Sequence, residues 1–232
     1  MRPEDIPLIR QLPLFASMSA ENFDRLLQTS YLQWFPAGVT LIREGDPADF
    51  FHVVVDGAVE LFAKHGERES AIALRHPVST FILAAVVKDA LYLMSARTID
   101  PSRLLMIPSE HIRLIIAQDA AFAQAMIDEL ANDFRGMVRA LKNYKLRTGA
   151  ERLANYLLRL YQESGHNQTV TLPHEKRLIA SLLGMTPENL SRALATLADY
   201  GVEVLGRRIV LRRVADLEAF AKPSPLIDEL IA

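Results

Sequence analysis

The chain has 232 residues, a length that predicts two compact domains. Half of its residues are hydrophobic and 23% are charged, a composition that excludes an intrinsically disordered chain. The formal net charge is only −2, so bulk charge alone gives no sign of a nucleic-acid-binding protein.

The absence of cysteine narrows the chemistry further. It excludes disulfides, thiolate zinc sites, cysteine nucleophiles and cysteine-ligated iron–sulfur clusters. The N-terminus mixes acidic and basic residues without a long apolar run, so we expect no signal peptide. The longest weakly charged stretch, residues 77–87, is too short to span a bilayer. We therefore expect a cytoplasmic protein with no membrane segment.

The first half of the chain predicts short helices and then a β-domain. Residues 4–33 suggest short helices, with Ser19 as an N-cap. From Phe35 onward, short strand-like runs alternate with turn signals rich in Gly, Asp and Pro, a pattern typical of an antiparallel sandwich or barrel that ends near residue 109. The expected strands are Val39–Ile42, Phe51–Val55, Ala58–Ala63, Ser70–Leu74 and Ser102–Ile107.

A long helix is predicted next, because apolar residues recur at alternating spacings of three and four. This heptad pattern favours a parallel dimer, although one helix packed on its own domain through a broader apolar stripe is the alternative. The stripe begins with Ala120 and Ala123, and its predicted dimer interface is Ile127, Leu130, Phe134, Met137, Leu141 and Tyr144.

After Thr148 the pattern indicates an amphipathic helix, a short strand, two helices that meet at residues 183–186, a hairpin turning at Gly206 and a last helix. Two short helices at a tight joint are typical of a helix-turn-helix, whose second helix enters the DNA major groove. Thr186 suits the N-cap and Pro187 the first position of that second helix.

The exposed half of this second helix carries groups that can read base edges. Leu190, Leu194 and Leu197 form its inward face, which leaves polar side chains outward. An Arg can pair with guanine, a Glu can accept from cytosine, and a Ser can contact either kind of edge. An ordinary solvated helix face is the alternative. The predicted DNA-binding residues here are Thr186, Glu188, Asn189, Ser191 and Arg192.

The hairpin that follows favours the DNA interpretation. Arg207, Arg208, Arg212 and Arg213 fall within seven residues, where a wing can contact phosphates. We expect Arg207 and Arg208 in particular to bind DNA. Residues 148–222 hold ten basic and eight acidic side chains, a net charge of +2. The small basic excess therefore falls on the part of the chain that is predicted to bind DNA.

With these motifs, nearly the whole chain resembles the CRP/FNR superfamily of bacterial transcription regulators. Residues 35–61 look like the β-barrel pattern of that family, and Glu188-x-x-Ser191-Arg192 matches the recognition signature of its FNR-like branch. Pro187 stands where the cyclic-AMP branch has an arginine. Residues 172–197 look most like regulators of the DNR/NnrR type. The resemblance implies TTGAT-like half-sites in a palindromic operator, a homodimer, and RNA polymerase as a partner.

The resemblance implies an α+β fold in three parts. These are a cyclic-nucleotide-binding-like β-barrel (jelly roll) over residues 1–118, a dimerisation helix over 119–147 and a winged helix-turn-helix over 148–232.

The effector remains open. Relatives that bind cyclic nucleotide have Gly, Glu and Arg at positions where this chain has Ile82, Leu83 and Tyr92 beside Phe81, which argues for an apolar pocket and against a cyclic nucleotide unless Arg75 or Arg97 substitutes. Likeness to nitric-oxide-sensing regulators keeps haem open, with an ordinary surface or hydrogen-bonded histidine as the alternative for each ligand candidate. Those candidates are His52, His65, His111 and above all His76, which lies nearest the apolar segment.

No enzyme motif stands in the sequence: we find no phosphate-binding loop, no G-x-S-x-G and no H-E-x-x-H. We therefore expect a non-enzyme. Two alternatives to the specific regulator stay open, namely a ligand-sensing module that acts on a protein partner without binding DNA, and a classical cyclic-nucleotide-responsive regulator.

Overall fold

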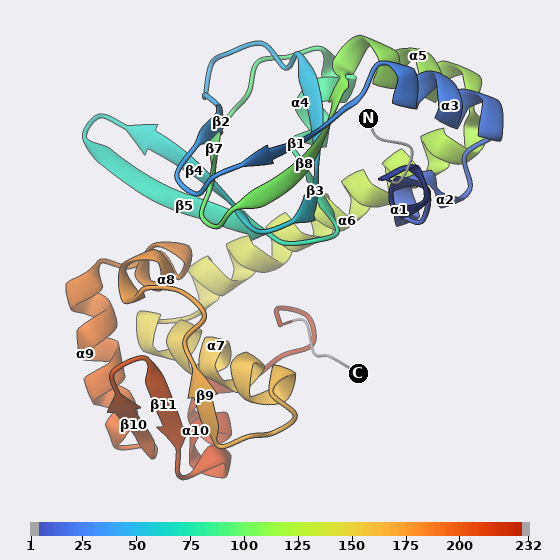
Figure 1. Ribbon diagram of the computed structural model, residues 1–232. Coiled ribbons are helices and arrows are strands. Elements are labelled where there is room, and N and C mark those ends of the chain that lie inside the picture. The colour runs from blue at the N-terminus through green and yellow to red at the C-terminus, as the bar shows by residue number, and fades with distance from the viewer. Residues whose placement is uncertain (1–4, 229–232) are drawn as a thin grey trace. The chain divides into compact units, whose positions relative to one another are not determined.

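The computed structural model describes residues 5–228, which form two compact units that divide between Asp133 and Phe134. The long helix α6 (Ala120–Leu146) contributes its first half to one unit and its second half to the other. The N-terminal unit is rich in strands and the C-terminal unit is mostly helical (Figure 1). This arrangement confirms the predicted α+β class.

Two four-stranded antiparallel sheets form the β-rich part of the N-terminal unit, with strand orders β1-β8-β3-β6 and β2-β7-β4-β5. Buried aliphatic and aromatic side chains from both sheets fill the core, and Phe51, Phe81 and Leu104 are almost completely buried. The strands are β1 (Tyr31–Phe35), β2 (Thr40–Ile42), β3 (Phe50–Asp56), β4 (Val59–His65), β5 (Arg68–Arg75), β6 (Ser79–Phe81), β7 (Ser95–Thr98) and β8 (Ser102–Pro108).

In this unit, helices precede the first strand and follow the last one, and one short helix lies between β6 and β7. Ser19 caps α3 as predicted, since its side chain accepts a hydrogen bond from the Asn22 backbone N–H. Phe122 and Met126 of α6 are buried in the same core as the strands. The helices are α1 (Ile6–Arg10), α2 (Pro13–Ala16), α3 (Ala20–Gln28), α4 (Leu83–Lys88) and α5 (Ser109–Gln118).

Asp119 joins the start of α6 to the start of α3. One of its carboxylate oxygens accepts a 3.0 Å hydrogen bond from the Phe122 N–H, and the other accepts from the Ser19 N–H at 2.9 Å and from Asn22 Nδ2 at 3.1 Å. These donors lower the pKa of the Asp119 carboxyl far below its ordinary value. One buried carboxylate therefore satisfies the first turns of two helices.

All five predicted strands are present, but the sequence reading of the N-terminal unit was incomplete. The helical interpretation of residues 4–33 was wrong at its end, because β1 begins at Tyr31 and pairs with β8. The strands β6 and β7 and the helix α4 were not predicted. These segments are only three to six residues long, too short to show a clear periodicity.

The C-terminal unit is a helical domain with a three-stranded antiparallel sheet of order β10-β11-β9. Thr148 and Glu151 form a capping box that starts α7. The leucines of α7 and α9 pack with β11 in one core. The elements are α7 (Gly149–Glu163), β9 (Thr169–Thr171), α8 (Lys176–Leu182), α9 (Pro187–Ala198), β10 (Val202–Leu205), β11 (Arg208–Leu211) and α10 (Val214–Ala221).

Among residues 5–228, no helix combines the length and the apolar character needed to cross a membrane.

Candidate nucleic-acid interface

The helix-turn-helix consists of α8 and α9, joined by the turn at residues 183–186. Gly184 has a φ of +63°, the left-handed conformation that a sharp turn between helices requires. Thr186 is the N-cap of α9, and its Oγ1 accepts a hydrogen bond from the Asn189 N–H at 3.2 Å. Pro187 takes the first helical position, where a missing N–H costs nothing. We call α9 the recognition helix from here on.

The two faces of the recognition helix differ sharply. Leu190, Leu194 and Leu197 are buried against the domain core. The remaining predicted residues of this helix and its N-cap are all exposed, and they are Thr186, Glu188, Asn189, Ser191 and Arg192. An acceptor, a hydroxyl and a guanidinium therefore share the solvent-facing side of one helix.

The charge state of Glu188 suits a hydrogen-bond acceptor. Hydrogen bonds from its own backbone N–H and from the Thr186 side chain lower the pKa of the Glu188 carboxyl. The carboxylate is therefore ionised at neutral pH and able to accept a hydrogen bond from a base amine. No ion pair within 4.0 Å involves the Arg192 guanidinium among the described residues.

The hairpin β10–β11 turns at Gly206, as predicted, and its four arginines have different neighbours. Arg207 Nη2 donates to the carbonyl oxygens of Leu172 and Pro173 at 3.1 and 3.0 Å, so this side chain is held against the loop before α8. Arg208 is exposed. Arg212 pairs with Glu203 and Arg213 with Asp216, so these two are already neutralised.

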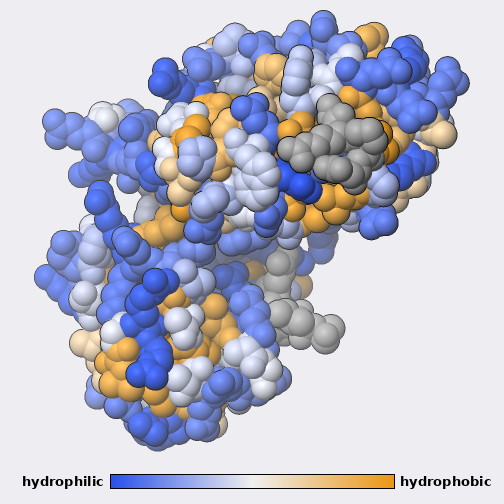
Figure 2. Space-filling model, in the orientation of Figure 1, coloured by the Kyte–Doolittle hydropathy of each residue, from blue (hydrophilic) through white to orange (hydrophobic). Residues whose placement is uncertain are grey.

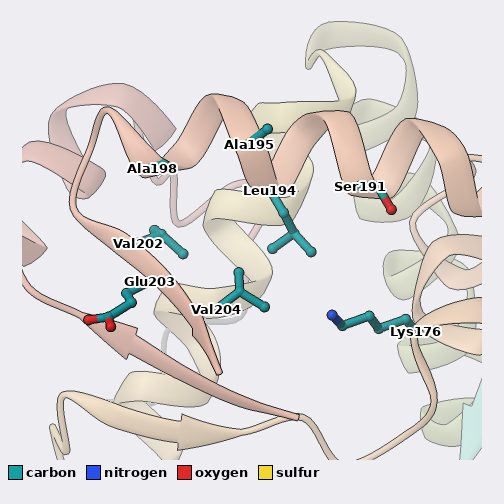
Figure 3. A pocket seen from close by; sticks show the side chains of 8 residues that line it. All are labelled: Lys176, Ser191, Leu194, Ala195, Ala198, Val202, Glu203 and Val204. Carbon is teal, nitrogen blue, oxygen red and sulfur yellow. The ribbon is translucent and has the colours of Figure 1, made fainter. Parts of the chain in front are cut away.

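A groove of about 510 Å³ lies between the recognition helix and β10. Its apolar floor includes Leu194 and Val204, which point toward each other, and the Lys176 side chain reaches in from the start of α8 (Figure 3). Hydrophobic surface is visible over α9 and β10 in the space-filling view, bordered by hydrophilic side chains (Figure 2). Ser191 lines this groove and also belongs to the exposed face of the recognition helix.

Lys176 is a candidate functional residue that sequence reasoning missed. Its side chain lines the same groove as Ser191, although the two residues are 15 positions apart in the chain. The only signal in the sequence was a Lys at the start of a helix in a basic pair with Arg177, which is equally typical of any solvated surface.

The predicted apolar seam lies on α6. Five of its six residues are exposed in the single chain, with exposed fractions of 57% for Ile127, 69% for Phe134, 70% for Met137, 54% for Leu141 and 43% for Tyr144. Leu130 is half-buried against the N-terminal core. The Tyr144 ring also lies against Gly184 of its own chain, and its hydroxyl donates to the Leu182 carbonyl at 3.1 Å.

The segment expected to line an effector pocket is part of the N-terminal core. Phe81 is 1% exposed, and its ring stacks on that of His52 with the centroids 5.0 Å apart. Leu83 is fully buried, and the buried Tyr92 donates its hydroxyl to the Phe50 carbonyl at 3.1 Å. Ile82 is half-buried and has a left-handed φ of 61°. These side chains fill space inside the protein.

Three of the four histidine candidates do not fit a haem as they stand. His76 and His65 are exposed, whereas the side chains of Phe81, Leu83 and Tyr92, expected to line an apolar pocket, are buried. His52 is buried, but the Phe81 ring covers its face, and burial lowers the pKa of His52 to about 4. His111 lies on α5, and its buried Nδ1 has no hydrogen-bond partner among residues 5–228. Within residues 5–228, no three His, Cys, Asp or Glu side chains gather as metal ligands.

Comparison with known proteins assigns both units. Residues 32–119 match the cyclic nucleotide-binding domain family, and residues 151–220 match the Crp-like helix-turn-helix domain family. The chain is 28% identical to the "Cyclic AMP receptor protein" of Thermus thermophilus over 211 residues, which cover 90% of this chain and 96% of that protein.

Solved structures are similar over almost the full length. A "putative cAMP-binding regulatory protein" from Silicibacter pomeroyi is 29% identical, with a TM-score of 0.57, and the match covers 96% of this chain and 100% of that one. The structure of DNR from Pseudomonas aeruginosa is 25% identical, with a TM-score of 0.51, over 95% of this chain and 99% of that one.

Proposed function

Since the chain belongs to the CRP/FNR family of DNA-binding transcription regulators, we propose that it acts as a homodimer that reads TTGAT-like half-sites of a palindromic operator through Glu188, Ser191 and Arg192. The observation that carries this proposal is the exposed recognition helix, whose buried leucines fix which side chains face outward. Near-neutral bulk charge does not oppose it, because base contacts and dimerisation supply affinity that phosphate contacts alone would not.

Two such helices in a dimer have to reach successive major grooves about 34 Å apart. The exposed stripe of Ile127, Phe134, Met137 and Leu141 on α6 supports a parallel dimer, since an unpaired apolar stripe of this kind is costly in water. RNA polymerase is the partner that a regulator bound at a promoter would contact.

Around these base contacts, we assign contacts with the phosphate backbone of the DNA to Thr186, Asn189, Arg207 and Arg208. Lys176 joins this set, because its ammonium lies in the groove that Ser191 also lines. Such contacts set the register of the protein on DNA without reading its sequence. Replacing Lys176 by Ala should therefore weaken binding to all sequences alike and reduce the salt dependence by about one counterion.

The decisive experiment is a mobility shift with a TTGAT-N4-ATCAA duplex. Arg192→Ala should weaken specific binding by about 1–3 kcal/mol, roughly 5- to 150-fold, and should relax the preference at one base position. Arg159→Ala, which removes an exposed arginine of α7, is the control for lost charge and should leave the preference unchanged. Equal affinity of the wild type for the operator and for a scrambled duplex at moderate salt would exclude the specific regulator and favour a module that acts on a protein partner.

For the effector, the apolar packing of Phe81, Leu83 and Tyr92 speaks against a cyclic nucleotide, whose phosphate needs charged or amide partners. Titration calorimetry with cyclic AMP and cyclic GMP should therefore give no binding heat. Stoichiometric cyclic AMP binding would favour the classical cyclic-nucleotide-responsive regulator instead. Because His76 is exposed, we also expect no stoichiometric haem uptake when haemin is added and the absorption spectrum is followed, and a Soret band that shifts with nitric oxide would contradict this expectation.

A further inference from the structure

The C-terminal segment after α10 folds back onto the joint between α6 and α7. Lys222 has a left-handed φ of 48°, which ends α10 and turns the chain. The last residue of α10, Ala221, is fixed at this point because its carbonyl accepts a 2.8 Å hydrogen bond from the buried Asn155 of α7. Residues 222–228, which we call the strap, therefore start from an anchored position.

Arg147 binds the strap with its guanidinium. This residue and Thr148 are the only ones between α6 and α7, so Arg147 stands at the joint itself. Its Nη1 and Nη2 donate to Asp228 Oδ1 and Oδ2 at 2.6 and 2.7 Å, a two-bond pairing of high geometric specificity. Nη2 also donates to the Lys222 carbonyl at 3.3 Å. The Arg147 side chain is only 6% exposed, so solvent screens this pair weakly.

The strap is itself shaped to present Asp228. Asp228 Oδ2 accepts from the Ser224 N–H at 2.8 Å, while the Asp228 N–H donates to the Ser224 carbonyl at 2.7 Å. A second tie reaches the last turns of α6, where Lys142 Nζ donates to the Leu226 carbonyl at 3.2 Å. The strap thus contacts the joint through Arg147 and the last turns of α6 through Lys142.

Arg152 holds the same joint on the side of the helix-turn-helix. Its Nη1 donates to the Arg147 carbonyl at 2.8 Å, and its Nε donates to the Leu183 carbonyl at 2.8 Å. Leu183 lies in the turn that precedes the recognition helix. Arg147 is therefore held by the strap through its side chain and by Arg152 through its backbone.

We propose that residues 222–228 are an intramolecular strap that locks the joint between α6 and α7 through the Arg147–Asp228 pair, and so keeps the helix-turn-helix in one arrangement relative to the end of α6. Release of the strap leaves a nearly buried guanidinium without its charged partner, with only the neutral Asn143 Oδ1 at 3.2 Å as a side-chain acceptor, a state that favours opening of the joint toward water. A loose joint has more conformational freedom to lose when two recognition helices engage one operator, which weakens binding.

The test uses hydrogen exchange of the full-length protein without DNA. In Asp228→Asn, amides of residues 145–151 should exchange at least about fivefold faster than in the wild type, whereas those of the recognition helix should not change. Glu163→Gln is the matched control, since it removes one negative charge from an exposed pair with Arg159. A second variant that ends after Lys222 removes all of the strap except its first residue and should give the same local increase.

If the amides at the joint exchanged at the wild-type rate in both Asp228→Asn and the shortened chain, the proposed role of the strap would be wrong. So would a loss of protection throughout the C-terminal core, because Asp228 would then support the domain and not the joint. A parallel mobility shift should show several-fold weaker operator binding for Asp228→Asn. This arm rests on the proposed function, and failure of the wild type to bind DNA would leave the exchange result interpretable by itself.

Discussion

Tyr144, on the last turn of α6, covers Gly184 in the turn before the recognition helix. The Tyr144 ring occupies the space where a side chain at residue 184 would begin. Gly184 also has a φ of +63°, which disfavours any residue with a Cβ. The site therefore requires glycine for two independent reasons, one in the backbone and one in the neighbouring ring.

Gly184→Ala should consequently lower the free energy of unfolding of the C-terminal unit by about 2–4 kcal/mol, combining left-handed strain with overpacking. Gly206→Ala is the control, because Gly206 has a φ of +68° and nothing within 4 Å of the added Cβ. It should cost only about 1–2 kcal/mol, the strain alone. Urea unfolding followed by circular dichroism measures both, and equal costs would show that the Tyr144 contact carries no energy.

Local signals explain what the sequence could predict. The cap of the recognition helix and its apolar face depend only on residues within one or two helical turns, namely Thr186, Pro187 and the leucines. Their pattern can therefore be recognised in the sequence alone. The same holds for the strands of the N-terminal unit that are bounded by turn residues, such as the one before Gly57, whose φ is 86°.

Contacts between distant residues explain what the sequence could not predict. The Arg147–Asp228 pair joins residues 81 positions apart, and neither residue belongs to a local motif. The strand β6 depends on pairing with residues 52–54 of β3. Tyr144 fits the heptad spacing, but periodicity gives no sign that its ring also lies against Gly184 of the same chain.

The exposed stripe on α6 leads to a prediction about assembly. Phe134→Glu should convert the dimer to a monomer in sedimentation analysis, since it places a charge within an apolar seam. Asn132→Glu adds the same charge on the opposite side of the helix, where the residue is also exposed, and should leave the dimer intact. Dimers of unchanged affinity in Phe134→Glu would mean that the subunits join elsewhere.

Asp119 should be a major source of stability in the N-terminal unit. Asp119→Asn should lower its free energy of unfolding by about 2–3 kcal/mol, because the amide cannot serve all three donors from Phe122, Ser19 and Asn22. Fluorescence of Trp34, the single tryptophan, reports this unfolding in urea. Asp24→Asn, at an exposed position of α3, is the control for charge and should cost little.

Acid should remove the contribution of Asp119 to the free energy of unfolding of the N-terminal unit. The folded carboxyl has a lowered pKa, whereas the unfolded one takes up a proton near its ordinary value of 3.8. The contribution is therefore complete above about pH 4 and declines as the pH falls further. The difference between wild type and Asp119→Asn should stay constant from pH 7 to 5 and shrink below pH 4, and a difference that already shrinks by pH 6 would contradict the assignment.

The buried His52 should make the N-terminal unit sensitive to mild acid. Burial lowers its folded pKa from 6.5 to about 4, so between these values the unfolded chain binds a proton that the folded one does not. Stability should fall as the pH decreases through this window, by at most about 3 kcal/mol. His52→Phe keeps a ring against Phe81 and cannot titrate, so this variant should lose less stability between pH 7 and pH 5.

His65→Gln is the control for replacing a histidine in this unit. His65 is exposed at the end of β4, outside the buried core that holds His52. If His52→Phe and the wild type lost stability in parallel from pH 7 to pH 5, the imidazole would have to be protonated within the fold. The Phe81 stack would then have to open to admit a counterion or water, because an unpaired imidazolium is too costly in an apolar core.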